Sequence, residues 1–480
     1  MSVRPPRPPR VGEPCRHLLV EDALLLDPAS GSSGVGTIAV EDGRVAELTW
    51  ATHRRSGVGP AVVVMPGLVD LHAHLREPGG EDAETIRTGL TAAAAGGFTT
   101  VCAMPNTTPP IDDAAAVRDV LARGRDSGSP VRLLVYGSTT AGRAGERLAP
   151  MAELAAAGAI GFSDDGAPVD EAALFRHALA YAGGVGRPVV EHPELRSLTR
   201  GAEAHDGLAA TILGLAGWPV AAEEAAVARA LALLDEVVRQ APPGAGPRLH
   251  LTHVSTSDAL VLIRLAKAAG LPVTCDVTPH HLALHDGWLG GDRRFAWEAA
   301  SAPWAGESAT AAPFDPATRV NPPLRSPDHA LALWAGLVDG TVDAIATDHA
   351  PHPETAKRVE FGDAAPGIAG LETALPLVLA GVAAGLADIT TVARALTVGP
   401  VRALGLAARG VPKPGLAVGA RADLVVVDRS APWTVHAAAL RSRAYATPLE
   451  GRLLDARILA TVADGRFAYL DEEWAGGTDR

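Results

Sequence analysis

The sequence predicts an α/β fold: a (β/α)8 barrel of the TIM type, with a flanking β-sandwich built from both ends of the chain. Eight short apolar or β-branched segments alternate with alanine-rich helical segments through the middle of the chain. Parallel strands that are covered on both faces read as continuous apolar runs, so this alternation is typical of such a barrel. Apolar runs broken by Gly, Ser and Asp stand at both ends and favour a β-rich unit there.

The two ends of the chain set the expected domain limits. Residues 1–14 carry Pro and Arg but no apolar core, so we expect a disordered arm and not a signal peptide. The runs HLLVEDALLL and GTIAVEDGRVAELTW place one part of the β-sandwich at 15–64. GLAVGARADLVVVD and ILATVADGRFAYL place the other part at 401–480, which leaves 65–400 for the barrel.

Each expected barrel strand is short and ends in polar residues. Helical stretches such as TIRTGLTAAAAGG and SDALVLIRLAKAAG lie between the strands. The eight strands are LVDLHAH (68–74), FTTVCAM (98–104), VRLLVYG (131–137), AIGFS (159–163), RPVVEH (187–192), RLHLTHV (248–254), PVTCDVT (272–278) and VDAIATD (342–348).

Composition limits the classes of function. The 480 residues include 42 basic and 55 acidic ones, and the net charge of −13 argues against nucleic acid or an anionic membrane as partner. Cys15, Cys102 and Cys275 are too few and too widely spaced for a disulfide framework, which favours a reducing compartment. The longest uncharged stretch, 373–387, contains Pro376 and is shorter than the ~20 residues of a membrane span. We therefore expect a soluble, cytoplasmic protein.

Side chains that can bind a metal follow five of the predicted strands. The carboxyl ends of barrel strands meet at one rim, where active sites lie. Imidazole and carboxylate groups are the N and O donors of a zinc-type centre. Each motif alone has an ordinary structural interpretation, such as a turn for SDDG, but their coincidence at strand ends predicts a metal site. The residues are His72, His74, Asp164, Asp165, His192, His253, Asp348, His349 and His352.

The motifs at these strand ends resemble those of the dihydroorotases of the amidohydrolase superfamily, and most closely the bacterial type I branch. The resemblance runs in the expected order from about residue 60 to about residue 430. The matching stretches are DLHAHLREPG (70–79), VCAMPNT (101–107), FSDDG (162–166), THVST (252–256), VTPHHL (277–282), NPPLR (321–325), ATDHAPH (346–352) and GIAGLET (367–373). This resemblance implies a metal-dependent hydrolase barrel beside a composite β-sandwich.

The chain departs from most of the superfamily in the group that bridges two metals. Most members use a carbamylated lysine from the fourth strand, but no lysine precedes Lys267 here. The resemblance to type I dihydroorotases implies an aspartate bridge instead. The spacing to His192 favours Asp165, with Asp164 as the alternative. Two cations would offset the repulsion between these adjacent carboxylates.

The resemblance also implies the metal ligands and the catalytic group. One or two Zn²⁺ ions are expected per subunit, with two favoured. His72, His74, Asp165 and Asp348 would hold the more buried ion, and His192, His253 and Asp165 the second. Zinc lowers the pKa of bound water towards ~7. Asp348 would then act as general base and afterwards as general acid.

The substrate side follows from the same resemblance. The expected reaction is the reversible closure of N-carbamoyl-L-aspartate to L-dihydroorotate and water, in de novo pyrimidine synthesis. Arg76 offers a bidentate partner for the substrate carboxylate, with Asn106 and His352 beside it. Asn321 would read the amide edge of the ring. The remaining expected contacts are His74 and backbone groups at Pro366 and Gly367.

Three departures from the family pattern remain. After His192 the chain reads PEL, so the surroundings of this ligand can differ from those in the family. The segment 286–320 is longer than expected, and a mobile flap, an oligomer contact and an inert insertion are alternative interpretations. Pro366 stands where an aromatic residue is expected.

Two competing functions are weighed against this one. Dihydropyrimidinases and allantoinases share His-x-His and the barrel, but they use the lysine bridge and lack the HLREPG and NPPLR context. A catalytically dead subunit that serves as a scaffold for aspartate transcarbamoylase would have lost ligands, whereas all six are present here. We expect a small-molecule substrate and a homo-oligomer, and association with aspartate transcarbamoylase stays open.

Overall fold

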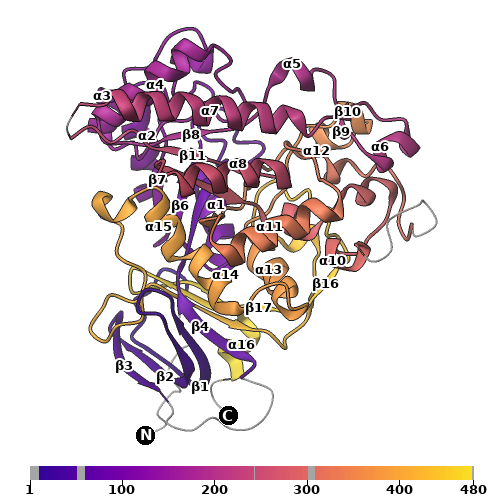
Figure 1. Ribbon diagram of the computed structural model, residues 1–480. Helices are drawn as coiled ribbons and strands as arrows, with labels where there is room; N and C mark the ends of the chain where they lie inside the picture. The colour runs from indigo at the N-terminus through magenta and orange to yellow at the C-terminus, as the bar shows by residue number, and fades with distance from the viewer. Residues whose placement is uncertain (1–9, 51–59, 243, 301–308, 478–480) are drawn as a thin grey trace, which may run out of the picture.

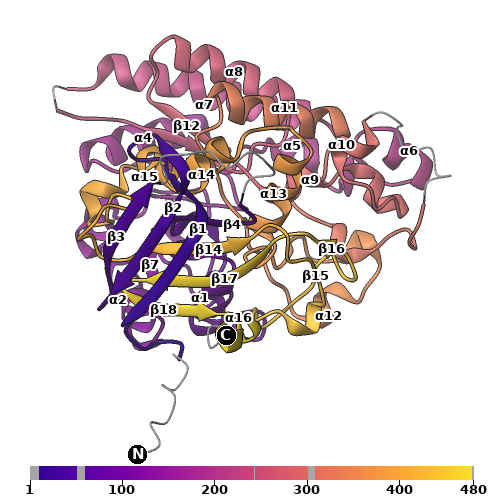
Figure 2. The same cartoon turned by 90° about the horizontal axis from the view of Figure 1, so that it is seen from below.

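A seven-stranded sheet combines strands from both ends of the chain. The structure, a computed structural model, describes residues 10–50, 60–242, 244–300 and 309–477. The strand order is β18-β17-β14-β4-β1-β2-β3, and indigo and yellow strands lie side by side in Figure 2. The strands are β1 (His17–Asp27), β2 (Ser32–Glu41), β3 (Arg44–Trp50), β4 (Val62–Pro66), β14 (Leu424–Asp428), β17 (Arg457–Ala463) and β18 (Arg466–Leu470).

Residues 1–9 of the predicted disordered arm (1–14) lie outside the described residues, and residues 10–14 are described. The ordered chain begins earlier than the predicted boundary, because the Gly12 N–H donates to the carbonyl of Phe467 (2.7 Å) and Pro14 pairs with Arg466. The first residues described therefore extend the sheet at β18.

The middle of the chain forms a TIM-barrel-like α/β unit that lies against this sheet (Figure 1). Its parallel strands form a three-stranded sheet, β5-β6-β7, and a four-stranded sheet, β13-β12-β11-β8. They are β5 (Leu68–Ala73), β6 (Phe98–Ala103), β7 (Arg132–Val135), β8 (Val189–Glu191), β11 (Leu249–Leu251), β12 (Val273–Val277) and β13 (Ala344–Ile345). Every residue of β5 and β6 is buried, as expected for strands covered on both faces.

Isolated bridges connect these two sheets at the places where the sequence predicts the fourth and eighth strands. Phe162 pairs in parallel with Gly137 on one side and with Val189 on the other, and Ala73 pairs with His349. The buried carboxylate of Asp70 strengthens the second junction, because it accepts hydrogen bonds from the backbone N–H (2.8 Å) and hydroxyl (2.6 Å) of Thr347. The ends of the first and last predicted strands are thereby held together.

Helices follow the strands and bury one face each. In α8, the Thr256 hydroxyl caps the first turn, and Leu260, Ile263 and Ala266 form the buried face at helical spacing. The helices that lie between the barrel strands or after them include α1 (Ile86–Ala95), α2 (Ala114–Asp126), α3 (Met151–Ala157), α4 (Ala172–Gly184), α7 (Ala221–Gln240), α8 (Ser257–Ala268), α11 (Pro327–Asp339), α13 (Ala374–Ala383), α14 (Ile389–Leu396) and α15 (Val398–Ala403). No helix in the described ranges has the length and apolar character of a membrane span.

Short elements complete the chain. Two-residue strands pair as β9 (Ala204–His205) with β10 (Gly217–Trp218), and β15 (Trp433–Thr434) with β16 (Leu453–Leu454). The short helices are α5 (Arg196–Thr199), α6 (Leu208–Leu213), α9 (Pro279–Ala283), α10 (Ala296–Ala299), α12 (Glu354–Lys357) and α16 (Glu472–Gly477).

The described parts of the long segment 286–320 pack against the barrel. Trp288, Leu289 and Phe295 are buried in a hydrophobic cluster that also contains Ile368 and Leu454. The Trp288 indole N–H donates to the carbonyl of Arg294 (2.6 Å). Residues 301–308 lie outside the described ranges, and the roles of flap and oligomer contact stay predictions.

Candidate metal centre and substrate site

Three of the predicted site residues have backbone conformations that non-glycine residues rarely adopt. The φ angles of Arg76, His253 and Asp348 are 59°, 40° and 46°. Such left-handed positions cost about 1–3 kcal/mol each and gather at functional sites. Hydrogen bonds hold one of them in place, since the His253 N–H donates to the carboxylate of Asp276 (2.7 Å).

Asp165 stands between two pairs of histidines. Its Oδ2 lies 3.4 Å from Nε2 of both His72 and His74. Its Oδ1 lies 3.5 Å from Nδ1 of His192 and 3.4 Å from Nε2 of His253. One carboxylate oxygen therefore faces each pair, and the atoms form two groups of potential metal ligands that share Asp165.

Asp348 adjoins the first of these groups. Its Oδ1 lies 3.2 Å from Nε2 of His74 and 3.5 Å from Nε2 of His72. Both histidines and Asp348 are buried. The structure thus brings together all six residues that the sequence assigns to the metal site.

Neighbouring groups direct the lone pairs of His72 and His74 towards this centre. The Thr252 hydroxyl donates its proton to Asp276 (3.1 Å), so it accepts from His72 Nδ1–H (2.7 Å) and leaves Nε2 to face the two carboxylates. Asn106 Oδ1 accepts from His74 Nδ1–H in the same way (2.8 Å). The Nε2 atoms of His72 and His74 lie only 3.2 Å apart, an arrangement that a bound cation would stabilise.

The second pair follows a similar pattern. Glu194 accepts from His192 Nε2–H (3.0 Å), which turns the lone pair of His192 Nδ1 towards Asp165. Nδ1 of His192 and Nε2 of His253 lie 2.9 Å apart. Nδ1 of His253 is buried and has no hydrogen-bond partner in the described structure. This donor set of imidazoles and a shared carboxylate fits zinc.

The charges of the cluster point to the same need for cations. Burial opposes protonation of His72, but the charges of Asp165 and Asp348 outweigh it and raise its pKa to about 9. Burial also opposes protonation of His192. Its hydrogen bonds to Asp165 and Glu194 outweigh burial and raise its pKa to about 10. Burial would raise the pKa of Asp165, but the neighbouring histidines hold it well below its usual range. Buried carboxylates of this kind require either protons on the histidines or metal ions.

On the substrate side, the Arg76 guanidinium is buried beside the centre. Its Nε donates to the carbonyl of Pro351 (3.1 Å). Burial lowers its pKa to about 10, so it remains charged at neutral pH. No carboxylate of the described residues lies within 4.0 Å of its nitrogens, so the charge is available to an anionic ligand.

His352 lies next to Arg76. Its Nε2 is 3.3 Å from a terminal nitrogen of Arg76 and 2.8 Å from the carbonyl oxygen of Pro366. Burial and the charge of Arg76 lower the pKa of His352 to about 3, so the ring is neutral. Its Nε2–H donates to Pro366, and the Gly367 N–H donates to Arg319 (2.9 Å). The Pro366 carbonyl and the Gly367 N–H thus each have a partner within the protein, and their contact with a substrate stays a prediction.

Asn321 has an unused acceptor. Its Oδ1 is buried and has no hydrogen-bond partner in the described structure. This oxygen is therefore available to accept a hydrogen bond from a ligand N–H.

Sequence reasoning missed several residues that orient the ligands. Thr252 and Asp276 direct His72, and Glu194 directs His192. Asp276, the one charged residue of the mostly buried strand β12, is a signal that indicates a functional contact. The sequence PEL after His192 differs from the family pattern, but its glutamate, Glu194, is the hydrogen-bond partner of His192.

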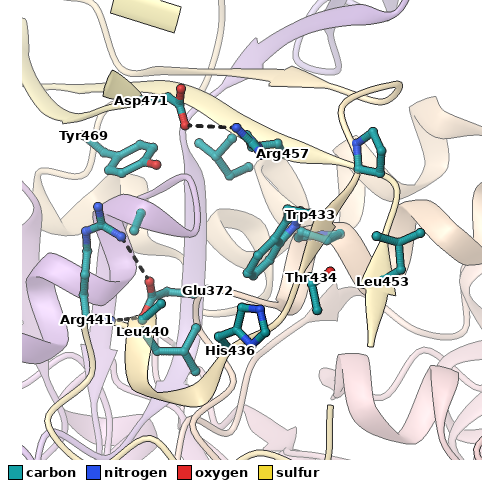
Figure 3. Close-up of a pocket in the computed structure, with 15 residues that line it drawn as sticks. Glu372, Trp433, Thr434, His436, Leu440, Arg441, Leu453, Arg457, Tyr469 and Asp471 are labelled. Atoms are coloured by element: carbon teal, nitrogen blue, oxygen red, sulfur yellow. Dashed lines mark hydrogen bonds and ion pairs between the residues drawn. The ribbon is translucent and has the colours of Figure 1, made fainter. Parts of the chain in front are cut away.

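A separate cavity of about 460 Å³ lies between the seven-stranded sheet and the segment that carries β15 (Figure 3). Arg441 and Arg457 point into it, and each faces a carboxylate, Glu372 at 3.7 Å and Asp471 at 3.9 Å. None of the predicted site residues lines this cavity.

Known proteins resemble this chain along almost its whole length. A family model described as dihydro-orotase-like matches residues 61–259. A dihydroorotase from Anaeromyxobacter sp. (strain K) is 45% identical over 456 residues, which cover 94% of this chain and 98% of the relative. A dihydroorotase from Pelobacter propionicus is 41% identical and covers 94% of this chain and 99% of its own length.

Solved structures agree on the fold. The L-hydantoinase (dihydropyrimidinase) from Arthrobacter aurescens superposes with a TM-score of 0.75 at 25% identity and covers 94% of this chain and 95% of its own. The dihydropyrimidinase from Brevibacillus agri gives a TM-score of 0.70 at 18% identity, with 95% of each chain covered. The relatives named dihydroorotase share far more of the sequence than do these hydantoinases. The chain belongs to the dihydroorotase family.

Proposed function

We propose that this chain is a zinc-dependent dihydroorotase, which interconverts N-carbamoyl-L-aspartate and L-dihydroorotate with release or uptake of water. The observation that carries the proposal is the position of Asp165, with one carboxylate oxygen towards each histidine pair. With metal bound, Asp165 would take the place of the lysine that bridges the metals in other cyclic-amide hydrolases. Family membership supports the same activity.

The residues around the centre have distinct roles in this proposal. His72, His74, Asp165, Asp348, His192 and His253 would hold two zinc ions. Zinc held there would supply a Lewis acid that acidifies water and polarises the amide carbonyl.

Substrate binding uses the charged guanidinium of Arg76 and the unpaired Oδ1 of Asn321. Arg76 binds the carboxylate of the ring substrate, with Asn106 and His352 beside it. Asn321 Oδ1 accepts from the ring N–H, which satisfies an atom otherwise buried without a partner.

Proton transfer falls to Asp348. In ring opening, water attacks the ring carbonyl and the C–N bond breaks. Asp348 accepts a proton from the attacking water and returns it to the departing nitrogen, so it ends the step ionised. The neighbouring His72 and His74 keep the pKa of Asp348 below its usual value despite burial, so it begins as the base.

The finer structural expectations belong to the same proposal. They are an eight-stranded (β/α)8 barrel at 65–400, a β-sandwich from 15–64 and 401–480, and a cytoplasmic location. A homo-oligomer and association with aspartate transcarbamoylase stay predictions.

The test measures zinc content and reaction in both directions on the purified chain. Dihydrouracil and hydantoin serve as comparison substrates, because they have the cyclic amide but lack the carboxylate that Arg76 would bind. We expect bound zinc and turnover of dihydroorotate. Preferential turnover of the uncharged rings would contradict the proposal and favour a hydantoinase, and zinc without any turnover would favour a partner-dependent subunit.

A further inference from the structure

We propose that His349 and Glu84 are positioning residues that hold Asp348 in its left-handed backbone conformation. This inference rests on the proposed function, in which Asp348 transfers the proton. His349 follows Asp348 directly in the sequence, and the side chains of His349 and Glu84 are fully buried. Although His349 ends a predicted barrel strand, it is not among the potential metal ligands of the described chain.

The imidazole of His349 is fixed at both of its nitrogen atoms. Its Nδ1 accepts from the Gly370 N–H (3.1 Å), so the proton of the neutral ring is on Nε2. Nε2–H then donates to Oε2 of Glu84 (3.2 Å). The ring therefore has one defined tautomer and one defined orientation.

The backbone of His349 is tied to the strand that carries the first histidine pair. Its carbonyl accepts from the N–H of His74 (2.8 Å), and the residue pairs with Ala73 in a parallel bridge. His349 thus connects a proposed metal ligand on β5 with the residue that follows Asp348.

Asp348 lies between two anchored neighbours. On one side, the Thr347 hydroxyl donates to the buried carboxylate of Asp70 (2.6 Å). On the other side, the ring of His349 donates to Glu84. The φ angle of Asp348 is 46°, and such a conformation persists only where the surrounding structure imposes it. The two buried carboxylates impose it from both sides.

Glu84 is itself held by the C-terminal part of the chain. The Ser442 hydroxyl donates to Oε2 (2.6 Å), and the Arg443 N–H donates to Oε1 (3.2 Å). The Thr85 N–H also donates to Oε1 (3.1 Å). A carboxylate surrounded by donors has little freedom to turn, so Glu84 is a rigid partner for His349.

His349→Phe is the central variant of the test. Phenylalanine keeps a ring in the same place but removes both hydrogen bonds of the imidazole. We expect kcat for dihydroorotate, measured at saturating zinc, to fall about 100-fold, because a small displacement of a catalytic group has an effect of this size. KM should change much less. In a crystal structure of the metal-free variant, the φ angle of Asp348 should leave the left-handed region.

A double-variant comparison separates positioning from a merely structural role. If His349 acts through Asp348, His349→Phe should lower kcat no further once Asp348→Asn has removed the base. A merely structural role would instead give losses in kcat that multiply.

Two conservative variants keep the test valid if His349→Phe does not fold. His349→Gln retains an N–H donor for Glu84, so kcat should fall less than in His349→Phe. Glu84→Gln replaces one acceptor by a donor, and we expect kcat to fall about 10-fold.

Asp343→Asn is the matched control. Asp343 stands just before β13, at the opposite end of this strand from Asp348. Its carboxylate accepts from the Cys275 N–H (2.8 Å) and from the Lys267 ammonium group. We expect a lower melting temperature in this variant with unchanged kcat and KM.

Multiplying losses in His349→Phe and Asp348→Asn would overturn the positioning role. An unchanged φ angle and carboxylate position of Asp348 in His349→Phe would overturn it as well. Lack of dihydroorotase activity in the wild type would contradict the proposed function instead. The crystal structure of the variant would still decide whether His349 holds Asp348.

Discussion

The carboxylates of Asp164 and Asp165 point to different environments although the two residues are adjacent. Asp164 accepts from the backbone N–H groups of Thr139 (2.9 Å) and Thr140 (3.1 Å) and from the Thr140 hydroxyl. Asp165 faces the histidine pairs. The Arg143 guanidinium donates to the carbonyl of Asp165 and closes the turn. One carboxylate thus holds the loop, and the other is left for the metal centre.

This division predicts different results for the two aspartates. Asp165→Ala should lose bound zinc and lower kcat/KM by more than about 100-fold, because even loss of an outer partner of a ligand costs about 10- to 100-fold. Asp164→Asn should keep zinc and lower stability by about 1–3 kcal/mol, because an NH2 group replaces one of the two oxygens that accept from Thr139 and Thr140. Zinc analysis and urea unfolding check the pair. Zinc loss only in Asp164→Asn would assign the bridge to Asp164.

Arg76 should act on substrate binding more than on metal binding. Arg76→Gln removes a charged partner of the substrate carboxylate, so we expect KM for dihydroorotate to rise roughly 30-fold, equivalent to about 2 kcal/mol. Zinc content should stay unchanged. Steady-state kinetics and zinc analysis measure both quantities, and an unchanged KM would remove Arg76 from the substrate site.

Asp348 should act on the chemical step. Asp348→Asn keeps the shape of the side chain but removes the base, so kcat should fall by about 10²–10⁴-fold. KM should change much less. Zinc content must be measured in parallel, because a fall in activity that zinc loss fully explains would assign Asp348 to metal binding alone.

Stability should rise with pH above neutrality because of Lys357. Its ammonium group is buried and donates to the carbonyls of Pro316 (3.1 Å) and Arg319 (3.3 Å). Burial lowers its pKa from 10.5 to about 7. Between these values the unfolded chain binds more protons than the folded one, so the free energy of unfolding increases with pH, by about 1.4 kcal/mol per pH unit for one proton. Below pH 7 both the folded and the unfolded chain carry this proton, so Lys357 no longer makes the free energy of unfolding depend on pH.

The comparison with Lys357→Met isolates this effect from other alkaline titrations. The difference in unfolding free energy between wild type and variant should shift in favour of the wild type from pH 7 to pH 9. Urea unfolding at several pH values measures it. A difference independent of pH would show that Lys357 keeps its ordinary pKa.

Trp288 tests whether the long segment after His285 is a packed part of the fold. The indole is fully buried, so Trp288→Ala should cost about 3–5 kcal/mol of stability. A substitution in a loosely attached flap would leave the melting temperature nearly unchanged. Val359→Ala, at an exposed apolar position, is a control that should change stability by less than about 0.5 kcal/mol.

The sequence by itself determined the alternation of strands and helices and the residues at the strand ends. Apolar runs such as FTTVCA mark buried strands because such strands are covered on both faces, and β6 lies where the pattern predicts it. His72 and His74 are recognisable because alternate residues of a strand share a face. The absence of lysine before Lys267 excludes a lysine bridge without any structure.

Only the tertiary structure decided how those residues meet. Asp164 and Asp165 are chemically identical, and the choice between them depends on Thr139 and Thr140, which come from another strand end. The hydrogen bond between His72 and Thr252 joins positions 180 residues apart in the sequence. Local pattern reports which face a side chain occupies, whereas hydrogen bonds between distant segments set its rotamer and its tautomer. For this reason the cluster of potential ligands was predictable from the sequence, and the groups that orient its members were not.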